Sequence, residues 1–237
     1  MSDHQNKLRP IFYDTETTGV KADRDRVIEI AAFDPVLNKT FEKLINPGIP
    51  IPKEASDIHH ITDDMVASAP SFKEIAIEFS EFCEGNVCLI AHNNDAFDVH
   101  FLKNEYARAE VPFPSWKFFD TLKWARRYRT DLPRHTLQFL REVYGIEANN
   151  AHRALDDVII LHKVFEFMTD DLAFEDVYAL LNKPRELQHM PFGKHQGTPI
   201  KQLPKSYVTW LSGSGAFDKP ENQDLKNALV KHGLLAV

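Results

Sequence analysis

A short apolar run that leads directly into acidic residues constrains this chain more than any other stretch. Residues 11–13 are apolar and suit a buried β-strand, and Asp14 and Glu16 follow them. Side chains alternate across a strand, so both carboxylates project to the same side and repel each other. A hard cation such as Mg²⁺ or Mn²⁺ offsets this repulsion, because such ions prefer carboxylate oxygens. The alternative is a plain solvated strand end, and acidic partners elsewhere in the chain decide between the two.

The charge of the chain is distributed unevenly along its 237 residues. The net charge is −7, but residues 184–237 carry 7 Lys or Arg and 4 Asp or Glu, a net charge of +3. We therefore predict a main domain over residues 8–182 and a small basic C-terminal module over residues 183–237. The negative total argues against general coating of nucleic acid, but it leaves room for a local basic site.

Several sequence features favour a cytoplasmic protein that does not contact membranes. The polar stretch before Pro10 lacks the apolar core of a signal peptide, and no apolar run approaches the length of a membrane span. Cys83 and Cys88 flank a predicted turn, and two cysteines cannot form a structural zinc site alone. We interpret them as reduced thiols.

The order of predicted elements indicates an α/β fold with a mixed central sheet. Three strands come first, within residues 11–45, and two more follow at residues 87–91 and 116–119, alternating with helices. The predicted longer helices cover residues 72–82, 96–109, 121–128, 136–144, 153–168 and 171–181. Sites in such folds form at the carboxyl ends of the strands, where Asp14, Glu16 and residues 92–95 are expected.

Three further residues are candidates for the same site. Asp98 lies one turn into the helix after residues 87–91, and it reaches Asp14 if the two strands are parallel neighbours. Its alternative role is that of an acid stabilised by the helix dipole. His152 and Asp157 are five residues apart, about 140° around a helix, so they cannot both face one ion from mid-helix. We expect His152 in the loop or first turn, where it suits a general base; its alternative is a lone surface histidine.

Taken in order, these segments resemble the DEDDh exonucleases, the DnaQ-like family. The resemblance extends over about residues 8–170, although His60 stands where glycine is usual. The pattern His-x-Ala-x-x-Asp selects Asp157 over Asp156. The segments that match family motifs are residues 13–19, 25–32, 58–66, 91–102, 119–122 and 152–157.

The family resemblance implies a fold, a reaction and a site. The implied fold is RNase H-like, with a five-stranded mixed sheet flanked by helices, and the implied enzyme is a 3′→5′ exonuclease that releases nucleoside monophosphates. Two Mg²⁺ or Mn²⁺ ions would be held by four acids, with His152 as general base. The implied metal ligands are Asp14, Glu16, Asp98 and Asp157. The implied contacts to the terminal nucleotide are Thr17, Thr18, Gly19, Ile61 and Asn93. Ile61 either wedges against a base or packs within its loop.

The substrate remains open at this stage, with DNA favoured over RNA. Four residues separate Asn93 from Asp98, a spacing that resembles exonuclease I and the three-prime repair exonucleases, which act on DNA ends. This favours a role in DNA repair or end processing; the rivals are an exoribonuclease and a non-catalytic nucleic-acid-binding module. The basic residues between Lys123 and Arg134 either follow the phosphate backbone or form a solvated face.

The C-terminal module contains the segment Met190-Pro-Phe-Gly-Lys-His-Gln-Gly197 and two aromatic residues, Tyr207 and Trp210. The segment resembles a small bacterial module of unclear function. The aromatic residues either hold nucleic acid by stacking, together with the positive charge, or form the core of the module.

Overall fold

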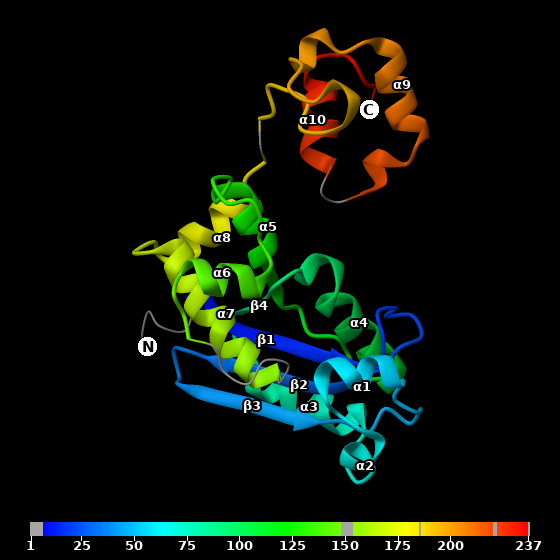
Figure 1. Cartoon of the computed structure of the whole chain (residues 1–237), viewed down its shortest axis with the longest axis vertical. Helices are drawn as coiled ribbons and strands as arrows, with labels where there is room; N and C mark the ends of the chain where they lie inside the picture. Colours follow the sequence, from blue (N-terminus) through cyan, green and yellow to red (C-terminus); the bar gives the residue numbers. More distant parts are fainter. Residues whose placement is uncertain (1–6, 148–153, 185, 220–221, 237) are drawn as a thin grey trace. The chain divides into compact units, whose positions relative to one another are not determined.

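The computed structural model describes residues 7–147, 154–184, 186–219 and 222–236. The chain separates into two compact units, residues 1–181 and residues 182–237 (Figure 1). In the described residues no helix is both long enough and apolar enough to cross a membrane.

Five strands form one mixed sheet in the order β3-β2-β1-β4-β5. Their bounds are β1 Arg9–Thr17, β2 Val27–Asp34, β3 Lys39–Leu44, β4 Val87–Ala91 and β5 Lys117–Asp120. Neighbours β1, β2 and β3 pair antiparallel, whereas β4 is parallel to both β1 and β5. The predicted five-stranded mixed sheet is therefore confirmed, and β4 is the parallel neighbour that the Asp98 argument required.

The helices of the first unit mostly follow the predicted ranges. They are α1 Lys53–His59, α2 Asp63–Val66, α3 Phe72–Phe82, α4 Asp98–Ala109, α5 Thr121–Tyr128, α6 Leu137–Val143, α7 Ala154–Thr169 and α8 Phe174–Asn182, with the short 3₁₀ helix η2 Asn94–Ala96. α3 begins at a capping box in which Ser71 and Glu74 satisfy each other's backbone groups. α1 was not predicted, because Pro-rich residues precede it; it ends at His60, which adopts the left-handed conformation at φ 61°.

The sheet is covered on both faces, and the alternation along β1 explains how. Ile11 and Tyr13 pack with α3 and α4 in one buried cluster, whereas Phe12 packs with α7 in another. Figure 1 shows α7 running across the sheet over β1 and β2. This packing brings the first turn of α7 to the acidic half of β1. Cys83 and Cys88 are buried free thiols, as interpreted from the sequence.

A buried ion pair ties the start of β2 to α4. Glu105, which is fully buried, accepts from Nε of Arg26 at 2.7 Å, from Nη1 of Arg108 at 3.2 Å and from the backbone of Val27 at 3.2 Å. Removing one partner of a buried pair leaves the other charge uncompensated.

We expect Glu105→Gln to lower the free energy of unfolding by about 3 kcal/mol, measured by urea denaturation. The matched control is Asp57→Asn, which breaks the exposed Lys53–Asp57 pair and should cost less than about 0.5 kcal/mol. Equal effects from the two substitutions would contradict the assignment of Glu105 as a structural residue.

The second unit is a small helical structure with its own core. Its helices are α9 Lys205–Gly213 and α10 Gln223–Lys231, with 3₁₀ turns η3 Gly193–His195, η4 Ile200–Gln202 and η5 Ala216–Asp218. Its buried residues are Met190, Ile200, Leu203, Val208, Leu211, Phe217, Leu225, Ala228 and Leu229. The core is therefore aliphatic apart from Phe217, and Trp210 does not belong to it.

Candidate active site

Three carboxylates converge at the end of the sheet toward which β1 runs. Asp14, Glu16 and Asp157 each offer an oxygen, and these oxygens lie within 4.8 Å of one another. The first two project from the same side of β1, and the third comes from the first turn of α7. Residues separated by more than 140 positions thus form one group of oxygen ligands, a donor set that suits a hard divalent cation.

Burial and the closeness of the carboxylates disfavour the ionised form of these acids. Burial raises the pKa of Asp14 well above its ordinary value, and the nearby carboxylates of Asp98, Glu16 and Asp157 raise it further. Asp98 is only 2% exposed, and burial raises its pKa to about 7, although hydrogen bonding to Thr15 opposes the shift. A bound cation would relieve the repulsion, because it favours the ionised form of each acid.

Asp98 lies beside the group of three rather than within it. Its Oδ1 accepts a hydrogen bond from Oγ1 of Thr15 at 2.8 Å. Thr15 alternates with Asp14 and Glu16 along β1, so Asp98 approaches the strand from the face covered by α4. The four predicted acids therefore gather at one strand end. Among the described residues, however, the group with oxygens within 4.8 Å of one another contains three of them and not Asp98.

The raised pKa of Asp98 gives a prediction for the metal-free protein. The folded state keeps this proton up to about pH 7, whereas the unfolded chain loses it near pH 4. The folded state thus binds more protons in this window, and stability falls as pH rises through it. Asp98→Asn, which mimics the protonated acid, should therefore raise the melting temperature in EDTA at pH 8 and change it little near pH 4. A lower melting temperature at pH 8 would contradict this.

Glu29 is a residue near the site that the sequence analysis did not single out. It lies directly opposite Glu16 in the β1–β2 register and is fully buried. Its Oε2 accepts from the backbone N–H of Ala154 at 3.2 Å, at the N-terminus of α7. Glu29 therefore helps to hold the turn that carries Asp157. The sequence contained one signal for this role, which was a single acid within an apolar strand. The structure adds its antiparallel register with Glu16.

The candidate general base, His152, lies outside the described residues, so its position in the loop or first turn stays a prediction. Asp157, five residues later, lies inside α7 as expected, and Nε2 of Gln138 approaches its Oδ1 at 3.4 Å.

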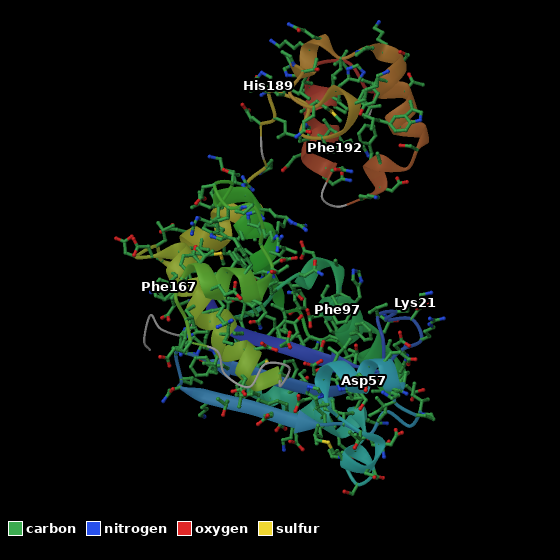
Figure 2. The ribbon with its side chains drawn as sticks, viewed as in Figure 1. Lys21, Asp57, Phe97, Phe167, His189 and Phe192 are labelled. Atoms are coloured by element: carbon green, nitrogen blue, oxygen red, sulfur yellow. The ribbon has the colours of Figure 1, made fainter. Side chains whose placement is uncertain are left out.

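A cavity of about 480 Å³ adjoins the acidic group. Thr17, Thr18 and Gly19 line it together with Glu16; that the first three contact a nucleotide stays a prediction. A Cβ at Gly19 would lie 2.5 Å from Oδ2 of Asp25, so any other residue there would displace that side chain. The apolar part of the lining consists of Val20, Pro52, Ala55, Ile58 and Phe97. Phe97, labelled in Figure 2, lies at the end of the sheet toward which β1 points.

Two of the predicted nucleotide contacts lie elsewhere. Ile61 is fully buried and packs with Ile28, Ile51 and Val66, so its side chain is not placed to wedge against a base, and the packing alternative holds. Asn93 adopts φ 70° and donates its backbone N–H to Oδ1 of Asp120, and it does not line the cavity. Ile58 is 60% exposed and lines the cavity, so it offers the apolar surface that the sequence analysis assigned to Ile61.

Much of the basic run after β5 is engaged in local contacts. Lys123 pairs with Asp95 at 3.1 Å, and Arg129 pairs with Asp131 at 2.9 Å. Arg127 donates to the backbone oxygen of Leu181 at 2.8 Å. These contacts favour a local structural role over a continuous phosphate track.

Comparison with known proteins identifies the first unit. The RNase T family model, described as "Exonuclease", matches residues 11–165. The chain belongs to this family, the DnaQ-like 3′→5′ exonucleases. It is 43% identical over 161 residues to the DNA polymerase III subunit epsilon of Treponema pallidum, covering 66% of this chain and 74% of that protein. It is 37% identical over 182 residues to exonuclease DPD1 of Arabidopsis thaliana, covering 70% of this chain and 57% of that protein.

Solved structures show the same fold for this exonuclease. Escherichia coli exonuclease I in complex with a dA16 oligonucleotide superposes with a TM-score of 0.63 at 22% identity, over 73% of this chain and 43% of that chain. Exonuclease X in complex with 5′ overhanging duplex DNA superposes with a TM-score of 0.56 at 24% identity, over 73% of this chain and 99% of that chain. The RNase H-like fold is thereby confirmed.

The second unit matches a different family. Residues 184–225 match a family model described as "Putative quorum-sensing-regulated virulence factor". That description states no chemistry for the unit.

Proposed function

We propose that this exonuclease hydrolyses DNA from the 3′ end to nucleoside monophosphates, in DNA repair or end processing, with two Mg²⁺ or Mn²⁺ ions per site. The observation that carries the proposal is the group of carboxylate oxygens from Asp14, Glu16 and Asp157 within 4.8 Å of one another. Burial and repulsion between the carboxylates raise the pKa of Asp14. A bound cation would offset this repulsion and stabilise the ionised acids.

In the proposed reaction, residues of this chain have three roles: binding the ions, accepting a proton and orienting the metal ligands. Asp14, Glu16, Asp98 and Asp157 would hold the ions; when bound, such ions lower the pKa of a water molecule and stabilise the charge of the leaving oxygen. The proton of the attacking water would pass to His152, because imidazole is a side chain suited to act as a general base near neutral pH. Asp98 would be oriented by its hydrogen bond from Thr15, and Asp157 by the contact of Glu29 with the start of α7.

The cavity beside Glu16 supports a site for the terminal nucleotide. Thr17, Thr18 and Gly19 form one part of its wall, and Ile58 and Phe97 offer apolar surface that suits a base. Asn93 is left out of this proposed site, because it does not line the cavity and its backbone N–H is bonded to Asp120.

Two comparisons favour DNA over RNA as the substrate: the names of the relatives and the DNA bound in some of the similar solved structures. The relatives include a DNA polymerase subunit, and the neighbouring exonuclease structures are complexes with DNA. The chain spans only about half of DPD1 and of exonuclease I, so their complete activities are not carried over.

The test offers 5′-labelled single-stranded DNA, duplex DNA and RNA of matched sequence, each with Mg²⁺. We expect a ladder of progressively shorter labelled DNA, and a 3′-labelled strand should release its label as a mononucleotide at once. Degradation of RNA alone would overturn the DNA assignment in favour of an exoribonuclease. Binding without degradation of any substrate would favour a non-catalytic binding module.

A further inference from the structure

The C-terminal unit leaves its largest aromatic side chain outside its core. Trp210 on α9 is 60% exposed, whereas Val208 and Leu211 of the same helix are buried. A unit of this size has few apolar side chains with which to build a core. An exposed tryptophan therefore forgoes the favourable free energy that burial of its ring would contribute to folding. The aromatic-core alternative is therefore wrong for Trp210, whereas Tyr207 is partly buried and packs against the core. The exposed Trp210 ring requires another explanation.

Trp210 is part of an ordered aromatic surface. Tyr207 lies three residues earlier on the same face of α9, and the two rings are nearly parallel, with centroids 5.7 Å apart and an interplanar angle of 21°. The ring of His195 also contacts Tyr207, tilted by 57° with centroids 4.4 Å apart. The rings therefore present a fixed stacking surface rather than one mobile side chain.

The segment that the sequence analysis singled out, residues 190–197, builds the wall opposite α9. Met190 and Gly197 close it into a loop: N–H of Gly197 donates to O of Met190 at 2.8 Å, and N–H of Met190 donates to O of Thr198 at 2.8 Å. Gly193 has φ +73°, and a Cβ there would lie 3.0 Å from Oη of Tyr207. Glycine thus allows the loop backbone to approach the aromatic surface closely.

Loop and helix together enclose a groove of about 440 Å³. Its aromatic lining includes Phe192, labelled in Figure 2 on the loop, as well as Tyr207 and Trp210. Its polar lining includes Lys194, Lys219 and Asn222. Among the described residues, no acidic side chain lines the groove and neither lysine is within ion-pair distance of a carboxylate.

We propose that this groove binds single-stranded DNA, with bases stacked on Trp210 and Tyr207 and phosphates held by Lys194 and Lys219. Aromatic rings flanked by lysines are the combination that binds single strands without reading sequence. The positive charge of residues 184–237, in a chain of net charge −7, makes this unit the part that attracts a polyanion. That the strand is DNA rather than RNA rests on the proposed function; the stacking chemistry itself serves either.

Such a site gives the exonuclease a second hold on its substrate. Because the two units share one chain, a strand bound at the groove stays at a high effective concentration near the other unit after each cleavage. The benefit should appear for long strands, which can occupy both sites, and should vanish for strands too short to do so.

The test measures binding in EDTA with the full chain, so that no hydrolysis is required. A labelled dT oligonucleotide is titrated while its anisotropy and the tryptophan emission are followed. We expect saturable quenching, and Trp210→Ala should weaken binding at least about tenfold and remove the quenching. The matched control is Phe167→Ala: Phe167 is 58% exposed and also stacks, on Tyr144, but lies on α7 of the first unit. This control should leave binding unchanged.

A second pair of variants tests the phosphate contacts. Lys194→Glu with Lys219→Glu should weaken binding and reduce its salt dependence, whereas Lys201→Glu with Lys226→Glu, two lysines of the same unit that do not line the groove, should act far less. Binding that is equally sensitive to both pairs, or insensitive to Trp210→Ala, would overturn the proposal and favour a protein segment or a second copy of the chain as occupant. Because binding is measured without catalysis, failure to degrade DNA would leave this proposal standing.

Discussion

Asp157→Asn is expected to lower the rate of DNA hydrolysis at least about a thousandfold, whereas Asp156→Asn should stay within a few-fold of wild type. The two carboxylates are adjacent in the first turn of α7, so they point about 100° apart. Only Asp157 offers an oxygen within 4.8 Å of those of Asp14 and Glu16. A thousandfold loss corresponds to about 4 kcal/mol of transition-state stabilisation, which is reasonable for the loss of one ligand to a catalytic ion.

The comparison of these two variants separates catalysis from folding. Both remove one charge from the same helix turn and keep the size of the side chain, so their effects on the helix dipole should be similar. Initial rates on 5′-labelled single-stranded DNA, with circular dichroism as a check on folding, make the measurement. Equal loss of activity in both variants would mean that the acidic group does not define the site.

Addition of Mg²⁺ or Mn²⁺ to the metal-free protein is expected to raise its melting temperature by about 5–10 °C at pH 8. Saturation at one hundred times the dissociation constant contributes about 2.7 kcal/mol, and a chain of this length gains about 2–4 °C per kcal/mol. The cation binds ionised carboxylates, and burial and mutual repulsion raise the pKa of both Asp14 and Asp98 in the folded protein.

The sign of the pH dependence follows from those raised pKa values. At pH 5 the folded metal-free protein keeps the proton on Asp98, whose pKa is about 7, so a cation must displace it and its stabilising effect shrinks. At pH 8 the pKa of Asp98, about 7, has been passed and the repulsion is present for the cation to relieve. Thermal melts at both pH values, with EDTA and with Asp157→Asn as controls, test this. An equal shift in Asp157→Asn would place the cation elsewhere.

Local sequence patterns anticipated most of the fold. The ranges of α3, α5 and β4 are as predicted, because their apolar periodicity and capping residues lie within the elements themselves. α1 was missed because proline-rich residues precede it. The start of α4 was predicted two residues early, because η2 occupies residues 94–96.

The sequence analysis named the residues of the candidate site, but it did not predict all of their contacts. Asp14, Glu16 and Asp157 gather as predicted, since strand alternation and the start of a helix determine where they point. Asp98 instead hydrogen-bonds to Thr15, which depends on how closely α4 packs on β1. Ile61 proved to be buried, because neighbouring segments supply a hydrophobic pocket that no local pattern reveals.

The sequence by itself determined which elements form and in what order, because those properties depend on neighbours along the chain, and the family resemblance indicated which acids gather at one end of the sheet. Only the tertiary structure decided that Glu29 supports the start of α7, that Ile58 rather than Ile61 lines the cavity, and that Trp210 stays exposed. Each of these depends on contacts between segments far apart in sequence. Burial is decided by which surfaces meet, and a linear pattern does not record that.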